Sequence, residues 1–318
     1  MKKPSLQHRG EFAIARTIEW GLSHVGRRAA ERFGEQLGQF VLSPLGIRRD
    51  VTEENLRRAF PDAEESWIRD ALRETYRHLG REVVAMIRLS TLDREEVRER
   101  VEIPDEDWAA FEAALAEGRG VILATGHFGN WELAAAAVAA RGVPIKAIVK
   151  RLSNPLVNRR LEGARAALGV ETIEMRDAPR QVPRALLSGK SVGIVADQHA
   201  GASGVMVPFF GTPASSHRGP AIFALRLGSP LFAAACRALP DGRYRLTGKR
   251  VSVERTDSLE ADVERLTAEL ARRLEDEIRL DPAQYFWLHK RWKNAPRKEL
   301  PSDGTGTRDH GDNGSHGS

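Results

Sequence analysis

Beyond residue 118, short apolar runs alternate with segments of helical periodicity, and this alternation restricts the folds open to the chain. Runs such as VILAT at 121–125 and SVGIVA at 191–196 are uncharged and rich in strand-forming residues. Strands that alternate with helices form largely parallel sheets covered by helices on both faces. The strands expected are 121–125, 144–149, 170–174, 191–196, 230–236 and 243–250, with helices at 130–141, 155–168, 178–189, 217–227 and 258–279 and a Gly-rich loop at 199–214.

The N-terminal third has a helical pattern instead. Apolar residues from Phe12 to Phe40 recur at spacings of three and four, which predicts one amphipathic helix over about residues 11–45. Arginines interrupt its apolar stripe, so two uses fit: packing on the core, or lying in the interface of an anionic membrane. Shorter helices are expected at 51–60 and 62–89, followed by acidic helical segments.

These patterns divide the chain into three parts. A helical N-terminal region, 1–117, carries the membrane-associating helix, and an α/β core, 118–295, is expected to form one integrated domain with it. The tail at 296–318 is polar and Gly-rich, which predicts disorder.

Composition restricts the function classes. No stretch approaches eighteen consecutive apolar residues, so we expect no transmembrane helix, and no apolar segment typical of a signal peptide follows the N-terminal lysines. The single cysteine, Cys236, excludes an internal disulfide and lies in an apolar run typical of a buried thiol. The net charge of +5 favours an anionic partner such as a phospholipid, a phosphorylated glycolipid, an acidic carrier protein or nucleic acid, although it also serves solubility.

The segment ATGHFGNWELAAAA at 124–137 carries the strongest chemical signal. A buried strand is expected to end there in a glycine-rich turn, with Asn130 as the N-cap of the next helix. His127 then lies at the carboxyl end of a central strand, where open α/β sheets place their sites. Glu132 falls in the first helical turn, where the helix dipole favours an ionised carboxylate.

The spacing of His127 and Glu132 indicates a pair that meets across a turn. On one helix, residues five apart are separated by about 140°, whereas a strand–turn–helix junction reverses the chain and allows convergence. A carboxylate on one imidazole nitrogen would fix the tautomer, and the other nitrogen could accept a proton from an alcohol. The alternative is a structural histidine in a tight turn. We predict the catalytic pair, with His127 as general base and Glu132 as its partner.

Other catalytic signatures are missing from the sequence. It has no G-x-S-x-G elbow, H-E-x-x-H, G-x-G-x-x-G or P-loop. His127 and Glu132 alone are too few ligands for zinc, so neither a metal nor a cofactor is expected.

Six sequence blocks resemble the lipid A biosynthesis (lauroyl/myristoyl) acyltransferase family, part of the lysophospholipid and glycerol-phosphate acyltransferase superfamily with its His-x4-Glu signature. The similarity covers nearly the whole chain to about residue 294. The blocks, in order, are NLRRAFP (55–61), GHFGNWE (126–132), KRLSNPLVNR (150–159), ADQ (196–198), GVMVPFFGTPA (204–214) and QYFWLHKRWK (284–293).

The resemblance implies a glycerol-phosphate acyltransferase-like fold and direct acyl transfer from acyl carrier protein or acyl-CoA. The implied acceptor is a hydroxyl of a lipid A precursor or a related anionic glycolipid or phospholipid. It also implies a location at the cytoplasmic face of the bacterial inner membrane, peripheral or monotopic here because this chain lacks the transmembrane anchor that many members carry. Membrane rather than nucleic acid is the expected partner surface.

Several further residues are predicted to bind substrate. Arg151 and Asn154 belong to one block, and Asp197 and Gln198 end a strand on the same sheet edge as His127, where Asp197 could instead brace the active-site loops. Phe209 and Phe210 lie in an apolar loop that could wall an acyl channel or pack as core. The aromatic and cationic residues at 286–293 suit a headgroup-level interface, or equally nucleic acid. His199 and His217 are interpreted as structural or solvated.

Two alternative functions fit the same residues. A thioesterase or lipid hydrolase would use the pair to activate water, and a non-catalytic membrane-binding protein would keep the scaffold without turnover. The intact His127 and Glu132 favour an enzyme.

Overall fold

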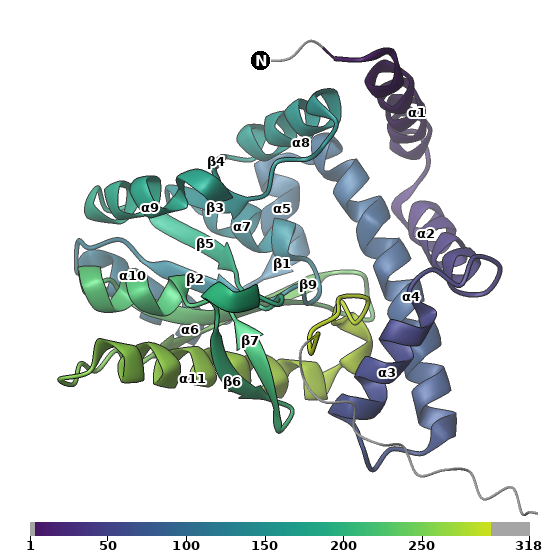
Figure 1. Ribbon diagram of the computed structural model, residues 1–318. Coiled ribbons are helices and arrows are strands. Elements are labelled where there is room, and N and C mark those ends of the chain that lie inside the picture. The colour runs from purple at the N-terminus through teal and green to yellow at the C-terminus, as the bar shows by residue number, and fades with distance from the viewer. Residues whose placement is uncertain (1–3, 294–318) are drawn as a thin grey trace, which may run out of the picture.

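Seven strands form one sheet in the order β1-β9-β8-β2-β5-β3-β4 in the computed structural model, which describes residues 4–293 (Figure 1). Neighbouring strands are parallel except β8 and β9, which are antiparallel. The predicted α/β class with a largely parallel mixed sheet is confirmed. The strands are β1 (Val101–Glu102), β2 (Ile122–Thr125), β3 (Ile145–Val149), β4 (Val170–Glu174), β5 (Ser191–Val195), β8 (Leu231–Ala238) and β9 (Tyr244–Val251).

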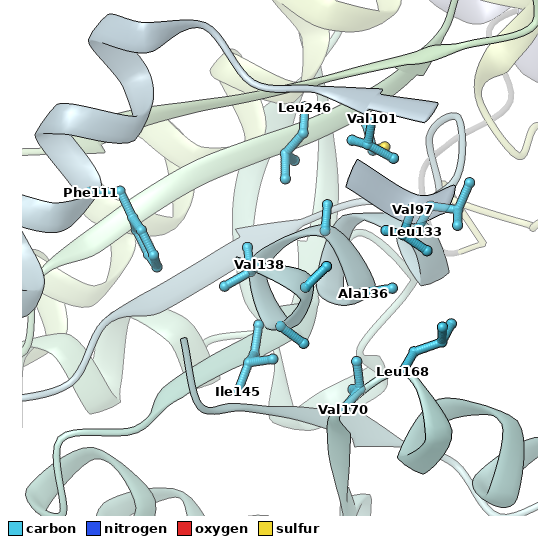
Figure 2. Packing of buried hydrophobic residues seen from close by; sticks show 14 of the residues in the cluster. Val97, Val101, Phe111, Leu133, Ala136, Val138, Ile145, Leu168, Val170 and Leu246 are labelled. Atoms are coloured by element: carbon cyan, nitrogen blue, oxygen red, sulfur yellow. The ribbon is translucent and has the colours of Figure 1, made fainter. Parts of the chain in front are cut away.

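Helices cover both faces of this sheet. One face packs against α5 (Arg94–Arg100), α6 (Asp105–Ala116), α7 (Trp131–Ala140) and α8 (Pro155–Ala167), and the other against α9 (Ala178–Leu187), α10 (Gly219–Leu227) and α11 (Leu259–Leu280). Figure 2 shows the first of these cores, with Val138 and Ile145 among the side chains between α7 and the sheet. Along β2, Ile122 packs on the α9–α11 side and Leu123 on the α7 side, which explains a continuously apolar strand.

The N-terminal helices stand together at one end of the sheet (Figure 1). They are α1 (Leu6–Ser23), α2 (Arg27–Leu42), α3 (Arg49–Ala59) and α4 (Glu65–Ile87), and short 3₁₀ turns occur at Arg88–Thr91, Met175–Asp177, Gly201–Ser203 and Pro282–Gln284. The single helix predicted over 11–45 is therefore wrong, because the chain breaks between Ser23 and Arg27. Gly26 is the extended N-cap of α2, with ψ of 153°. Apolar residues recur at spacings of three and four on both sides of the break, so the sequence pattern does not indicate it.

A second correction concerns residues 199–214. The expected Gly-rich loop contains most of a β-hairpin, β6 (Val205–Phe209) and β7 (Thr212–Ser216), which packs against α11. Its two-residue turn places Phe210 at φ 50° and Gly211 at φ 69°, the left-handed conformation that tight hairpin turns require. The sequence pattern did not predict the hairpin because each strand contains a proline, Pro208 in β6 and Pro213 in β7, and proline disfavours regular strand pairing.

No helix between residues 4 and 293 has both the length and the hydropathy to cross a membrane. The tail predicted to be disordered, 296–318, lies outside the described residues.

Glycines set the distance between α2 and α4. A Cβ on Gly38 would lie 1.8 Å from the Tyr76 carbonyl oxygen, and one on Gly34 would lie 2.5 Å from that of Gly80. A Cβ on Gly80 would in turn lie 1.9 Å from the Gly34 carbonyl oxygen. The two backbones are therefore in direct contact, and neither helix can accept a side chain at the crossing without moving.

We predict that Gly38→Ala lowers the free energy of unfolding by about 1–3 kcal/mol, because the added methyl group forces the helices apart. Gly21→Ala is the matched control: it is also in a helix, but its added Cβ meets nothing within 4 Å. That change should stabilise the protein by about 0.5–1 kcal/mol. Urea unfolding of both variants measures the difference, and equal effects would contradict the close crossing.

Candidate active site

His127 lies in the turn between β2 and α7, at the carboxyl end of the central strand, as predicted. Hydrogen bonds fix this turn from two sides: Asn130 N–H donates to the Cys236 carbonyl at 2.9 Å, and Phe286 N–H donates to the His127 carbonyl at 2.9 Å. Gly129 has φ 54°, and a Cβ there would lie 2.0 Å from the Cys236 carbonyl oxygen, so only glycine fits. Asn130 is the N-cap, its side-chain oxygen accepting from Leu133 N–H at 2.8 Å.

The carboxylate that binds His127 is Asp197. Its Oδ1 lies 2.7 Å from His127 Nδ1, and its Oδ2 accepts from the His127 backbone N–H at 3.0 Å. The register explains the contact: Thr125 of β2 pairs with Val195 of β5, so the second residue beyond each strand faces its counterpart. Of the two roles considered for Asp197, substrate binding and bracing of the active-site loops, its position fits bracing, and the group it braces is His127.

The predicted contact between Glu132 and His127 is wrong. Glu132 instead forms a bidentate ion pair with Arg165 in the last turn of α8, at 2.6 and 2.8 Å. Both side chains are largely buried. A guanidinium with two parallel hydrogen bonds holds a carboxylate more firmly than an imidazole would, so Glu132 is directed toward α8. It still lines the same cavity as His127 and acts on the imidazole at longer range.

The two partners of the buried pair stabilise each other's charge. Burial raises the pKa of Asp197, but the charge and hydrogen bonds of His127 and the nearby Arg291 outweigh it and lower the pKa to about 2. Burial lowers the pKa of His127, yet Asp197, with a smaller contribution from Glu132, raises it above its usual 6.5. Because an ionised Asp197 can only accept, Nδ1 carries the proton and Nε2 is left as the proton acceptor.

His127 opens on a largely apolar cavity of about 380 Å³ between the sheet and the helices α6 and α7. Its polar lining includes Glu132, Arg165, Lys150 and Gln198. Most of the remaining lining is aliphatic or aromatic, and includes Trp108, Phe111, Leu123, Trp131, Val138, Ile145, Val149, Met175, Phe232 and Leu246. An imidazole at the edge of an apolar cavity suits a substrate with a long hydrocarbon part.

Gln198 and Arg151 lie differently with respect to the cavity. Gln198 lines it, and its Nε2 lies 3.5 Å from His127 Nε2. Arg151 does not line the cavity, and its Nη1 lies 3.9 Å from Glu174 Oε1. The neighbouring Lys150 lines the cavity instead.

Asn154 also lies away from the cavity. It is the buried N-cap of α8, and its Nδ2 donates to Glu11 at 2.8 Å and to the His8 carbonyl at 3.0 Å. Asn154 therefore fastens α1 to α8.

The aromatic candidates belong to the core. Phe209 and Phe210 are buried in a cluster with Phe60 and Trp287, so of the two alternatives for their loop the structure shows packing. Phe209 lines a neighbouring cavity rather than that of His127. In the segment 286–293, where an interface was expected, Trp287, Arg291 and Trp292 are buried and cannot contribute to it, whereas Lys290 and Lys293 are exposed.

Four site residues escaped the sequence prediction: Lys150, Arg165, His217 and Arg291. Arg291 is 2% exposed and donates to the Ser215 carbonyl at 2.6 Å, beside the hairpin that follows Asp197. His217, interpreted as structural or solvated, lines the cavity. Of these four, only Lys150 and Arg291 lie in the blocks that carry the family resemblance, and a buried arginine in QYFWLHKRWK looks like any surface cation in sequence.

The fold, with an imidazole beside an apolar cavity, fits an acyltransferase. The chain belongs to the bacterial lipid A biosynthesis acyltransferase family, whose profile matches residues 2–294, and this membership indicates an acyltransferase. It is 28% identical over 289 residues to a phosphatidylinositol mannoside acyltransferase of Mycolicibacterium smegmatis, covering 88% of this chain and 87% of that protein.

Two further relatives carry similar names. A Mycobacterium tuberculosis protein, also called phosphatidylinositol mannoside acyltransferase, is 27% identical over 89% of this chain and 83% of its own. A lipid A biosynthesis lauroyltransferase of Escherichia coli K12 is 26% identical over 83% of this chain and 85% of its own.

We predict that Asp197→Asn lowers the pKa of His127, because the negative charge that stabilises the imidazolium is lost. NMR titration of labelled histidine measures this directly and does not depend on activity. Asp276→Asn is the control, since that exposed carboxylate is paired with Arg272 on α11. An unchanged His127 titration in folded Asp197→Asn would show that the pair does not control the imidazole.

Proposed function

We propose that this protein transfers a fatty acyl chain from acyl carrier protein or acyl-CoA to a hydroxyl of a membrane glycolipid, with His127 as general base. The observation that carries the proposal is the His127–Asp197 pair at the edge of a large apolar cavity. The names of the relatives support a phosphatidylinositol mannoside or a lipid A precursor as acceptor, with a related phospholipid as the next choice.

The reaction follows from the free Nε2 of His127. Nε2 removes the proton of the acceptor hydroxyl while its oxygen attacks the thioester carbonyl, so the new C–O bond forms. The C–S bond then breaks, and the imidazolium returns its proton to the thiolate that leaves. Asp197 holds the tautomer and stabilises the imidazolium during the transfer. None of the described residues lining the cavity is a serine or cysteine, which favours direct transfer without an acyl-enzyme.

The remaining site residues have positioning roles in this proposal. The Arg165–Glu132 pair fixes the first turn of α7 and keeps a negative charge near the imidazolium. Lys150 lies where it can attract an anionic headgroup, and the Gln198 amide lies beside Nε2, where the acceptor hydroxyl must bind. The apolar walls are suited to the acyl chain.

His127→Ala should reduce turnover roughly 10²–10⁴-fold while the protein stays folded, because the proton acceptor is lost. The assay follows acylated lipid and free thiol with palmitoyl-CoA and phosphatidylinositol mannoside or lipid IVA in mixed micelles. Near-normal transfer by the folded variant contradicts the proposal. Fatty acid released at the same rate with and without acceptor would instead indicate a hydrolase, and binding without turnover on either acceptor a membrane-binding protein.

We also propose a peripheral location at the cytoplasmic face of the inner membrane, and the apolar outer face of α1 supports the peripheral attachment. Leu6 is 86% exposed, Trp20 65% and Ile14 64%, and Ile18 lies on the same side of the helix. The arc from Trp20 to Ile18 carries no charged residue, with Arg9 and Arg16 beside its Trp20 edge and Glu11 beside its Ile18 edge. Through Asn154, this helix is fastened to α8, which carries Arg165 of the active site.

Replacing Ile14 and Ile18 together with glutamate should weaken binding to vesicles containing anionic phospholipid roughly 10²-fold, because two exposed apolar side chains that would enter the bilayer are lost. Leu187→Glu combined with Leu280→Glu is the matched control, because these residues are 69% and 66% exposed but lie at the ends of α9 and α11. Co-sedimentation with phosphatidylglycerol vesicles measures both. Equal loss in the two variants would mean that added charge alone, and not the α1 face, weakens binding.

A further inference from the structure

A second cavity, of about 530 Å³, lies between α2, α4 and the turn that joins β8 to β9. Among the residues that the structure describes, it shares no lining residue with the cavity of His127. The first turn of α7 lies between the two cavities, since Glu132 lines one and Leu133 the other. Its lining includes deeply buried residues, with Ala30 1%, Val84 2% and Leu133 3% exposed. The cavity is therefore a deep feature of the fold that the proposed reaction does not use.

Arginines dominate the polar lining of this cavity. They come from α2, from α4 and the 3₁₀ turn after it, and from the end of α5, and they are Arg27, Arg28, Arg32, Arg81, Arg88 and Arg100. Guanidinium groups gathered around one cavity repel one another unless anions lie near them. The partners of these arginines therefore decide whether the cavity can accept a further anion.

Carboxylates of the protein compensate only part of this positive charge. Three of the arginines have a carboxylate partner, and the pairs are Arg27–Glu31, Arg81–Glu35 and Arg100–Glu96, at 3.7, 2.9 and 3.4 Å. The other carboxyl groups that line the cavity accept hydrogen bonds from residues outside this set of arginines, and they are Glu82, Asp241 and Asp281.

The other three arginines have no carboxylate partner among residues 4–293. Arg28 and Arg32 lie one turn apart on α2, are exposed, and form neither an ion pair nor a hydrogen bond with a described residue. Arg88 is partly buried and donates to backbone groups instead, the carbonyls of Leu22 and Val25. These three guanidinium groups can therefore bind an anion that enters the cavity.

The N-terminus of α2 adds further donors at the same place. Gly26 is the N-cap, and no side chain accepts a hydrogen bond from the first turn. Ala29 and Ala30 N–H donate to the Gly26 carbonyl, whereas within the described part of the chain Arg27 and Arg28 N–H have no acceptor. Because Arg27 and Arg28 line the cavity, the positive end of the helix dipole lies at its edge. Free N–H groups at a helix N-terminus are suited to binding phosphate.

Two of these arginines also hold the walls of the cavity. Arg27 Nη1 donates to the Gly242 carbonyl at 2.8 Å, which ties α2 to the turn between β8 and β9. Arg88 binds the chain where α1 ends and α2 begins, so the cavity lies beside that break. Walls held in this way leave little to reorganise when a ligand binds, which favours affinity.

We propose that this arginine-lined cavity binds a phosphate ester, with Arg28, Arg32, Arg88 and the free N–H groups of α2 as donors to the phosphate. A planar guanidinium can donate two parallel hydrogen bonds to phosphate oxygens. The ester is either the headgroup of an anionic lipid, drawn from the membrane that α1 is proposed to contact, or a soluble phosphorylated polyol or sugar. The cavity is separate from that of His127, so the inference does not depend on acyl transfer.

Calorimetric titration of the full chain with inositol 1-phosphate tests the site, and myo-inositol, which lacks the phosphate, should not bind. Replacing Arg28 and Arg32 together with glutamine should weaken binding roughly 10–100-fold, because two charge-assisted contacts with the phosphate are lost. Arg180→Gln combined with Arg184→Gln is the matched control. These two arginines have the same spacing on α9, are exposed, and likewise have no ion-pair partner in the described chain. This control should bind like the wild type.

Backbone NMR locates the bound phosphate without any substitution. Adding inositol 1-phosphate should shift the amide signals of Arg27 and Arg28, because their N–H groups gain an acceptor. The amide signals of Arg180 and Arg184 should stay unchanged.

Dihexanoyl phosphatidylinositol, used below its micellar concentration, separates the two sources of the ester. Tighter binding than inositol 1-phosphate supports a lipid headgroup, and weaker binding supports a soluble ester, provided that the Arg28 and Arg32 double variant loses the binding. The proposal is overturned if neither compound binds the wild type, or if the double variant binds as well as its control. It is also overturned if both compounds leave the Arg27 and Arg28 amide signals in place.

Discussion

The structure around the active site depends on one carboxylate. Asp197 binds both the ring and the backbone N–H of His127, and it thereby joins the carboxyl ends of the two adjacent strands β2 and β5. This interaction selects the tautomer, orients the free Nε2 and stabilises the protonated form of the imidazole. It is available because parallel strands end at the same sheet edge and β2 and β5 are in register there.

The rest of the fold keeps that edge rigid. The Cys236 carbonyl of β8 accepts the Asn130 N–H, and the C-terminal segment binds the His127 carbonyl and buries Arg291 near Asp197. The turn is thus held by segments more than a hundred residues away in sequence. A turn held by several hydrogen bonds suits the proposed general base, because the position of its Nε2 must be correct before the substrate binds.

Two ion pairs, His127–Asp197 and Glu132–Arg165, have different roles at the site. In the proposed reaction the His127–Asp197 pair carries the proton transfer, whereas Glu132 and Arg165 join α7 to α8. Both glutamate and aspartate lie close enough to raise the pKa of His127, but only the aspartate touches it. The His-x4-Glu spacing therefore describes a helix-to-helix fastening beside the base rather than a contact with it.

The sequence by itself determined the local elements. Alternating strands and helices, the Asn130 cap and the place of His127 at a strand end all follow from short-range backbone preferences, and the structure agrees with them. Only the tertiary structure decided which carboxylate meets the imidazole, that Phe209 and Trp287 pack inside, and that the first helix is broken before Arg27. The reason is physical: a pattern of neighbouring residues records what one segment prefers. The partner of His127 depends instead on the pairing of two strands seventy residues apart.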